Sequence, residues 1–304
     1  MTSGYIQANT GGRLHAATEP SLSPLNRGFL YGDAIYEVWR TYSGVIFAWD
    51  EHWRRFRESA RALHMTVEHS QDEILREIRR AAAAFREHTK GSGDLYIRFQ
   101  VARGSGPIGL DTALAGKSEF VILVQDCPAL TAEKASGGLR LSVATTLRRN
   151  PVQSLDPAWK TGNYLNNLLC LREARARGAD DVVILNMEGE IAEASVANIA
   201  FAKGAEIFTP PLTAGILPGI TRGLVLGGVA REAGLTVTEK AIKPEDVGGM
   251  DECFLLSTTK DIVYVRSIDS FTYTVGPGSA AARLKAQFAL AATRYAASHP
   301  ELKV

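Results

Sequence analysis

Three residues in the middle of the chain combine an amine, a phenol and a carboxylate. Lys160 lies in the segment Trp159-Lys160-Thr161-Gly162-Asn163-Tyr164, at the mouth of a predicted helix whose first turn contains Tyr164. Glu193 follows on a predicted strand, among small apolar residues. A lysine shielded from water deprotonates more readily and can form an imine with an aldehyde. A buried carboxylate needs a partner, such as a protonated pyridine nitrogen. The combination can therefore hold an aldehyde cofactor, pyridoxal phosphate, as a Schiff base and control the protonation of its ring.

Each of these residues also has an ordinary explanation. Lys160 is one of ten lysines, and a lysine just before a helix is usually a solvated surface residue. Glu193 could form an ion pair with an arginine instead of meeting a cofactor. Their occurrence together, with the anion-binding pattern described next, favours the chemical interpretation.

A loop further along the chain could bind the phosphate of such a cofactor. The segment Gly215-Ile216-Leu217-Pro218-Gly219-Ile220-Thr221-Arg222 leads into a predicted helix. Free amides, the helix dipole and the Thr221 hydroxyl suit an anion there. Ser257-Thr258-Thr259, at the end of a predicted strand, could add hydroxyls and amides to the same anion.

Apolar periodicity predicts the elements that must position these groups. Two strands, 94–102 and 119–125, have no helix between them and are expected to pair antiparallel. After Lys160, the buried stripe of the next helix is predicted to be Leu165, Leu168, Leu169 and Ala174. Further strands are predicted at 44–48, 139–144, 182–185, 190–192, 235–238 and 253–257, and further helices at 50–63 (capped by Asp50), 71–88, 219–231 and 280–297.

A chain of 304 residues is long enough for two domains. The segment 127–138, with Pro128 and the Gly137-Gly138 pair, is the predicted linker. It separates an N-terminal domain, 1–126, from a C-terminal domain, 139–304, that contains Lys160. The mixture of helices and antiparallel strands indicates an α+β fold with a cleft between the two domains.

The composition argues against several classes of partner. The 34 basic and 33 acidic side chains leave a net charge of +1, so no nucleic-acid or membrane surface is indicated. No apolar run approaches the length of a membrane span, and the histidines lack metal-ligand spacing. Three separated cysteines in apolar contexts indicate reduced thiols and a cytoplasmic protein. The arginine clusters at 54–61 and 76–80 interleave with glutamates and indicate solvated helix faces.

One glycine motif is expected to be misleading. Gly104-Ser105-Gly106-Pro107-Ile108-Gly109 matches the dinucleotide-binding pattern G-x-G-x-x-G after a strand. The short stretch from there to Glu119 leaves no room for the crossover helix that this motif requires. We therefore expect a loop at the rim of the cleft.

Several separated segments carry a family resemblance. They are Asn26-Arg27-Gly28-Phe29-Leu30-Tyr31-Gly32-Asp33, Glu51-His52-Trp53-Arg54-Arg55-Phe56, Lys160 with its helix, Glu193 to Asn198, and Leu217 to Arg222. In this order they resemble the class IV aminotransferases, the fold-type IV family of pyridoxal phosphate enzymes. The resemblance implies a smaller N-terminal α/β domain, a larger C-terminal pseudo-barrel domain and an active site in the cleft. It also implies a homodimer, with residues 26–33 and the loop after Arg103 near the subunit contact.

The resemblance implies roles for individual residues. Lys160 resembles the Schiff-base lysine, which also moves the proton between the substrate Cα and the C4′ atom of the cofactor. Glu193 resembles the partner of the pyridine nitrogen, and Arg55, in a His-x-x-Arg motif, resembles the arginine that grips the phosphate. Tyr164 looks like the tyrosine that binds the phenolic oxygen, although branched-chain enzymes have one more residue between lysine and tyrosine. The remaining phosphate ligands correspond to Ile220, Thr221 and Thr258.

The resemblance to branched-chain enzymes and the resemblance to D-amino-acid enzymes imply different substrates. Tyr36, Arg40 and Arg98 lie where branched-chain enzymes place pocket residues, and the amides of Thr259 and Lys260 could receive a carboxylate. Two features instead look like the D-amino-acid enzymes: the stretch 257–259 and the spacing from the lysine to the helix. Branched-chain enzymes also usually have glycine where this chain has Val38. The arginine and histidine with which D-amino-acid enzymes trap a carboxylate would fall near Ile108 and Leu110, which cannot do that.

The sequence therefore predicts a transaminase that moves an amino group between an aliphatic, branched-chain type amino acid and a 2-oxo acid such as 2-oxoglutarate. The first alternative is a D-amino-acid transaminase without the usual carboxylate trap. An aminodeoxychorismate lyase and a vitamin B6-binding module without turnover are less favoured alternatives.

Overall fold

The computed structural model describes residues 4–304 and divides into two compact units. Unit 1 comprises Met1–Pro128, Trp159–Asn163 and Ala292–Val304, and unit 2 comprises Ala129–Ala158 and Tyr164–Ala291. The short segment with Lys160 therefore belongs to unit 1, although the chain on either side of it belongs to unit 2. The boundaries 1–126 and 139–304 stay a prediction for the two domains.

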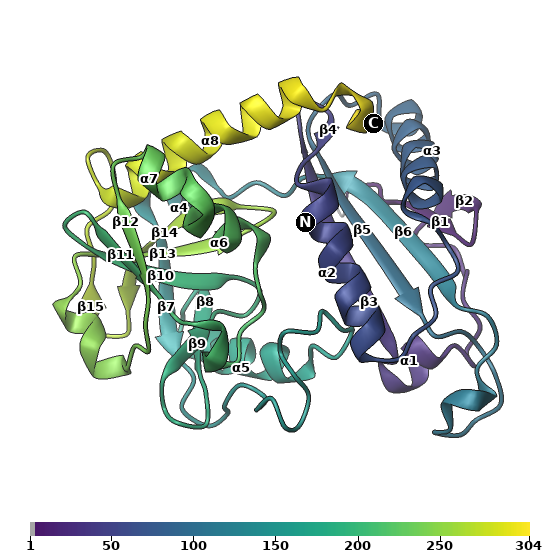
Figure 1. Cartoon of the computed structure of the whole chain (residues 1–304), viewed down its shortest axis with the longest axis horizontal. Helices are drawn as coiled ribbons and strands as arrows, with labels where there is room; N and C mark the ends of the chain where they lie inside the picture. Colours follow the sequence, from purple (N-terminus) through teal and green to yellow (C-terminus); the bar gives the residue numbers. More distant parts are fainter. Residues whose placement is uncertain (1–3) are drawn as a thin grey trace. The chain divides into compact units, whose positions relative to one another are not determined.

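Unit 1 is built on a six-stranded antiparallel sheet. The predicted pairing of 94–102 with 119–125 is confirmed by the register between β5 and β6. Figure 1 shows two long helices, α2 (Trp49–Ala62) and α3 (Gln71–Thr89), beside these strands. The strand order is β2 (Arg13–Ala16), β1 (Gln7–Thr10), β6 (Glu119–Asp126), β5 (Leu95–Ala102), β3 (Ala34–Tyr42) and β4 (Val45–Ile46).

Alternation along β3 gives this sheet two different faces. The core under α2 and α3 takes every second residue of β3, beginning with the fully buried Ile35. Tyr36 and Arg40 belong to the opposite face. Because Val38 is paired with Arg98 of β5, Arg98 lies on that same opposite face. The strand pattern thus places three predicted substrate residues on one surface of the sheet.

The long helices α2 and α3 of unit 1 begin in different ways. Ser70 and Glu73 form a capping box at the start of α3, where Glu73 accepts the Ser70 amide at 2.8 Å. The prediction of an Asp50 cap for α2 is wrong, since α2 begins at Trp49 after Ala48, whose backbone is left-handed with φ 53°. This turn also shortens the predicted strand 44–48 to the two residues of β4.

Unit 2 contains a nine-stranded mixed sheet that closes on itself. Strand β9 pairs with both β8 and β10, so the path from β10 through β13, β14, β7 and β8 returns to its start. This closure agrees with the expected pseudo-barrel. The order is β12 (Thr236–Glu239), β11 (Glu206–Thr209), β10 (Asn198–Lys203), β13 (Glu252–Ser257), β14 (Asp261–Ile268), β7 (Leu139–Val143), β8 (Asp181–Leu185) and β9 (Ile191–Glu193), with β15 (Phe271–Thr272) beside β14.

One sequence prediction about the helices of unit 2 is wrong. The predicted linker, which stays a prediction, contains a short helix, α4 (Ala132–Gly137), which Thr131 caps by accepting the Lys134 amide. Helix α5 (Leu165–Ala176) does not bury the predicted stripe, since Leu165 and Leu168 are 67% and 58% exposed. Ala174 of the predicted stripe is buried, together with Asn167 and Cys170, which were not predicted.

The predicted helix 219–231 is interrupted. It consists of α6 (Ile220–Leu224), a π-helical turn η3 (Val225–Val229) and α7 (Ala230–Glu232). The long C-terminal helix α8 (Ala280–Ser298) contributes residues to both units. Among residues 4–304, no helix is long and apolar enough to cross a membrane. The remaining helical elements are α1 (Arg27–Tyr31), η1 (Thr112–Leu114), η2 (Leu212–Ala214), η4 (Pro244–Gly249) and η5 (Pro300–Leu302).

Candidate active site

The backbone of Lys160 is extended and runs beside strand β3 of unit 1. The Tyr36 amide donates to the Lys160 carbonyl at 3.0 Å, and the Gly162 amide donates to the Ala34 carbonyl at 2.8 Å. The predicted position at the mouth of a helix is therefore wrong, because α5 begins only at Leu165. Pairing with β3 satisfies the polar backbone of this segment, which a helix start would have left open.

The side chain of Lys160 meets Tyr36. Its Nζ atom lies 3.4 Å from the Tyr36 hydroxyl, to which it donates, and 4.4 Å from the ring centroid. The guanidinium of Arg98 lies 3.7 Å from the same ring and also donates to Gln100. Two cations thus share one buried tyrosine, whose ring face attracts positive charge. The guanidinium of Arg40, the other predicted substrate arginine, lies over the ring of Tyr42, 4.4 Å from its centroid.

Arg55 lies on α2 in a buried network with Glu37 and His52. Its Nε and Nη2 atoms donate to the two oxygens of Glu37 at 2.8 and 2.7 Å, and His52 Nδ1 is 2.7 Å from Glu37 Oε2. Burial opposes ionisation of Glu37, but the charges of Arg55 and His52 outweigh it and hold the Glu37 pKa well below its usual range. Burial lowers the pKa of His52, against the attraction of Glu37. Since an ionised carboxylate only accepts, His52 Nδ1 is the donor.

Glu193 ends strand β9 of unit 2 and is 5% exposed. Its Oε1 atom lies 2.9 Å from Nη2 of the buried Arg149. Its Oε2 atom accepts from the Leu217 amide at 3.1 Å and from Asn198 Nδ2 at 3.3 Å. The arginine partner that the sequence left open is therefore present and is Arg149. A carboxylate offers about four acceptor positions, and the contacts with Arg149, the Leu217 amide and Asn198 use three of them.

The predicted phosphate residues of unit 2 lie at the ends of regular elements. Ile220 and the buried Thr221 begin α6, directly after Gly219. A Cβ atom at Gly219 would stand 1.9 Å from Asn198 Oδ1, so a larger residue here would have to displace the Asn198 side chain. The segment from Thr258 to Lys260 forms the turn between β13 and β14.

Tyr164 and Arg222 complete the two predicted segments. Tyr164 occupies the cap position before α5 and not the first turn of that helix. Arg222 is buried and tied into unit 2, because it bonds the Pro210 carbonyl at 2.8 Å and pairs with Glu239. Arg222 is therefore occupied in holding α6 against β12.

Some residues of these networks were not predicted as parts of the site. Glu37 follows the predicted site residue Tyr36, and His52 begins the His-x-x-Arg motif that contains Arg55. Their neighbourhood in the sequence is the signal that could have identified them. Asn198 reaches Glu193 across the pairing of β10 with β9. Arg149 is held beside β8, the other neighbour of β9, because its amide donates to the Leu185 carbonyl at 2.8 Å. Nothing local in the sequence marks Arg149 as its partner.

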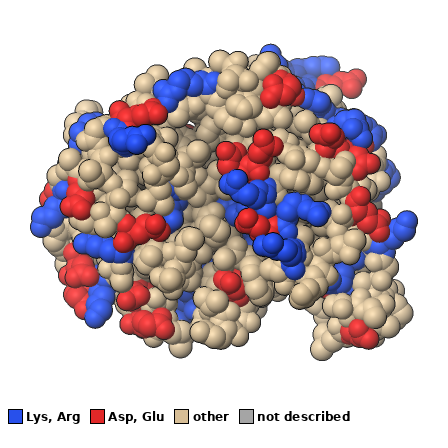
Figure 2. Space-filling model, viewed as in Figure 1, with Lys and Arg blue, Asp and Glu red and all other residues tan. Residues whose placement is uncertain are grey.

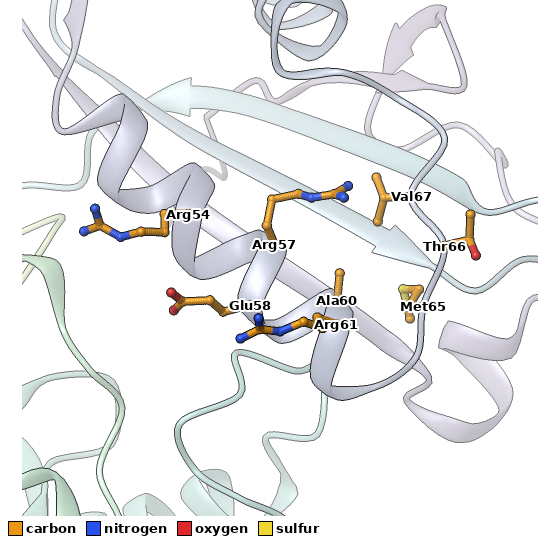
Figure 3. Close-up of a pocket in the computed structure, with 8 residues that line it drawn as sticks. All are labelled: Arg54, Arg57, Glu58, Ala60, Arg61, Met65, Thr66 and Val67. Carbon is orange, nitrogen blue, oxygen red and sulfur yellow. The ribbon is translucent and has the colours of Figure 1, made fainter.

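A pocket of about 520 Å³ lies on the surface of unit 1, outside these networks. Figure 2 shows lysine and arginine side chains gathered over α2, where this pocket lies. Arg57 extends toward Val67, whereas Arg54, Glu58 and Arg61 point away from it (Figure 3). Because these charged groups do not converge, we do not assign the active site to this pocket. No group of three histidine, cysteine, aspartate or glutamate residues in the described part of the chain could hold a metal ion.

Comparison with known proteins gives consistent results. Residues 34–268 match the sequence model described as amino-transferase class IV. A putative branched-chain-amino-acid aminotransferase of Methanocaldococcus jannaschii is 34% identical over 83% of this chain and 84% of its own length. A D-alanine aminotransferase of Bacillus licheniformis is 30% identical over 88% of this chain and 89% of its own length. The T.th. branched-chain amino acid aminotransferase, in complex with N-(5'-phosphopyridoxyl)-L-glutamate, superposes with a TM-score of 0.84, at 26% identity, over 100% of this chain and 99% of that one.

Proposed function

Because the chain belongs to the class IV aminotransferase family, we propose that it transfers an amino group between an aliphatic, branched-chain type amino acid and a 2-oxo acid such as 2-oxoglutarate. The observation that carries this proposal is the similarity to a relative named for branched-chain amino acids, 34% identical over 83% of the chain. The superposition on the T.th. branched-chain enzyme, which spans the whole chain, supports it.

The side chains proposed for the site fit pyridoxal 5'-phosphate as the cofactor. The T.th. enzyme was solved in complex with N-(5'-phosphopyridoxyl)-L-glutamate. Lys160 supplies an amine for the aldehyde, and the buried Glu193 supplies a negative charge for the ring nitrogen. Arg55 supplies a guanidinium for the phosphate, and Tyr164 a phenol for the phenolic oxygen. When bound, the cofactor supplies the electron sink that makes the Cα proton of an amino acid acidic. The further phosphate ligands that we propose are Ile220, Thr221 and Thr258, and the proposed substrate contacts are Tyr36, Arg40, Arg98, Thr259 and Lys260.

In this proposal the chain's own residues position and move protons. Lys160 Nζ, 3.4 Å from the Tyr36 hydroxyl, would be the base that accepts the proton from the substrate Cα. Arg149, Asn198 and the Leu217 amide all donate to the carboxylate of Glu193, and such contacts favour its charged form. Arg55 is held rigid by Glu37, so it needs little reordering to meet an anion.

An absorbance experiment tests the proposed reaction. The cofactor band of the purified enzyme should shift when L-leucine is added and return when 2-oxoglutarate follows. A band that responds to no amine would indicate a binding module without turnover. Release of pyruvate from aminodeoxychorismate would indicate a lyase.

Glu193→Gln is expected to leave the cofactor bound and to slow proton transfer at the substrate Cα by about 10²-fold or more. Glutamine keeps the shape of the side chain but cannot offer a negative charge to the ring nitrogen. The measurements are cofactor retention after ultrafiltration and the washout of deuterium from Cα-labelled L-leucine. Glu188→Gln, an exposed change in the neighbouring hairpin, is the matched control. Washout at the unchanged rate in Glu193→Gln would contradict the assigned role.

A D-amino-acid transaminase is the second candidate, favoured by the D-alanine aminotransferase relative. We expect L-leucine to react faster than D-alanine in single-turnover half-reactions. The reason is that Ile108 and Leu110 of this chain are apolar and cannot pair the carboxylate that every substrate brings. The rates of half-reactions with both enantiomers of alanine, glutamate and leucine distinguish the two substrate classes. Faster reaction with the D-forms would overturn the substrate class and leave transamination intact.

We further propose that the enzyme is a cytoplasmic homodimer. Unit 1 exposes three large apolar side chains, Phe29, Ile108 and Leu110, at 74%, 76% and 81%. Arg27 ties their two segments together by donating to the carbonyls of Gly109 and Leu110 at 2.8 and 3.1 Å. An apolar surface held in a defined shape suits a second copy of the chain.

Leu110→Asp is expected to shift this dimer toward monomer, because a charge would be buried in the contact without a partner. Light scattering across a dilution series measures the shift. Leu290→Asp is the control, since Leu290 is also exposed, at 56%, but lies on α8. A wild-type enzyme that is active as a monomer at the assay concentration would refute the dimer.

A further inference from the structure

The hydroxyl of Ser59 links Lys160 to the helix that carries Arg55. Ser59 lies on α2, one turn after Arg55, and is 2% exposed. Its hydroxyl donates to the Arg55 carbonyl at 3.0 Å and accepts the Lys160 amide at 3.1 Å. A serine hydroxyl has a single proton, so donation to Arg55 fixes Oγ as the acceptor toward Lys160. Because β3 holds the Lys160 carbonyl, both polar backbone groups of this residue have assigned partners.

Together with the pair between Arg55 and Glu37, these hydrogen bonds form a closed ring of contacts within unit 1. It runs from the Tyr36 amide on β3 to the Lys160 carbonyl, and from the Lys160 amide to Ser59 on α2. It returns through the Arg55 guanidinium to Glu37, the residue after Tyr36 on the same strand. The backbone of the proposed Schiff-base lysine and the side chain of the proposed phosphate arginine are thereby held by the same two elements.

We propose that Ser59 is a positioning residue for the reaction: it fixes the backbone of Lys160 so that Nζ stays beside the Tyr36 hydroxyl. The inference rests on the proposed function in giving Lys160 its chemical role. Without the Ser59 hydroxyl the Lys160 amide loses its partner, and the segment Trp159–Asn163 is left with its pairing to β3 and the bond from Asn163 Nδ2 to the Gly32 carbonyl. A base that must hold a defined position in the transition state is sensitive to such a loss.

Three variants of Ser59 separate positioning from general destabilisation. Ser59→Ala removes the acceptor, and Ser59→Cys keeps a side chain of similar size but offers only a weak acceptor. Ser59→Thr keeps the hydroxyl, which in a helix can still bond the carbonyl four residues back. Ser136→Ala is the matched control, because Ser136 makes the same type of bond, to the Ala132 carbonyl at 2.9 Å, on the exposed surface of α4.

Hydrogen exchange of the full-length protein is the first readout, with and without added cofactor, on peptides that cover 159–163. Exchange of this segment should accelerate about 5- to 30-fold in Ser59→Ala and Ser59→Cys, the effect of one lost hydrogen bond. The steady-state readout is kcat, which should fall by a similar factor while the KM for L-leucine stays within about twofold. Ser59→Thr should restore most of both, and Ser136→Ala should change neither.

Unchanged exchange of 159–163 in Ser59→Ala would overturn the proposal. So would faster exchange with an unchanged kcat, because Ser59 would then stabilise the fold without serving the reaction. If Ser59→Ala does not fold, the same criteria apply to Ser59→Cys. Borohydride labelling of a lysine other than Lys160 would instead refute the role of Lys160 in the proposed function. The hydrogen-exchange result would then remain valid as a structural finding.

Discussion

Lys160→Ala is expected to abolish covalent attachment of pyridoxal phosphate and to lower kcat by about 10³-fold or more. The amine that is lost serves both as the attachment point and as the proton carrier. Its surroundings are specific, because Nζ lies beside the Tyr36 hydroxyl and the backbone is bonded to Ser59 and Tyr36. No other residue is expected to take over both tasks.

Borohydride reduction of the holoenzyme followed by peptide mapping checks the attachment directly. The label should be found on Lys160 in the wild type and should be absent from Lys160→Ala. Lys203→Ala, at the exposed end of β10, is the matched control and should keep both the label and the activity. A label on a different lysine of the wild-type enzyme would refute the assignment, whatever the activity of the variant.

The regular elements were predictable where local signals were strong. Helix α3 begins with the capping pair Ser70 and Glu73 and carries a regular apolar stripe, so its predicted span, 71–88, lies within one residue of the observed one. Strand-like runs with no helix between them likewise indicated β5 and β6 and their antiparallel pairing. In these elements the local propensity and the tertiary burial favour the same structure.

The surroundings of the site were less predictable, because they depend on contacts between distant segments. The extended backbone at Lys160 forms by pairing with β3, which lies more than a hundred residues away in the sequence. Leu165 and Leu168 followed helical spacing and are nevertheless exposed on α5, so spacing alone does not say which face is buried. Glu193 was expected on a strand and lies at the end of β9, but Arg149 comes to it from a distant segment whose backbone bonds to β8.

Glu37→Gln is expected to destabilise unit 1 by about 3–5 kcal/mol, because it leaves the buried charge of Arg55 without its partner. The variant should also retain the cofactor less well, since Arg55 loses the carboxylate that orients it. Glu58→Gln, on the exposed face of the same helix, should change the free energy of unfolding by less than about 0.5 kcal/mol. Urea unfolding at pH 7 measures both variants.

The dependence of this effect on pH has a definite sign. Arg55 and His52 hold the folded-state pKa of Glu37 well below that of an unfolded glutamate, which is about 4.3. The folded state therefore binds fewer protons than the unfolded state between these two values, so the contribution of Glu37 is fully present above about pH 4.3 and is lost progressively below it. Unfolding measured from pH 5 to pH 3 should show wild type losing stability more steeply than Glu37→Gln, by at most about 1.4 kcal/mol per pH unit for one proton. Parallel curves for the two proteins would mean that Glu37 does not ionise differently in the folded state, and the buried Glu37–Arg55 pair would lose its assigned part in holding the arginine.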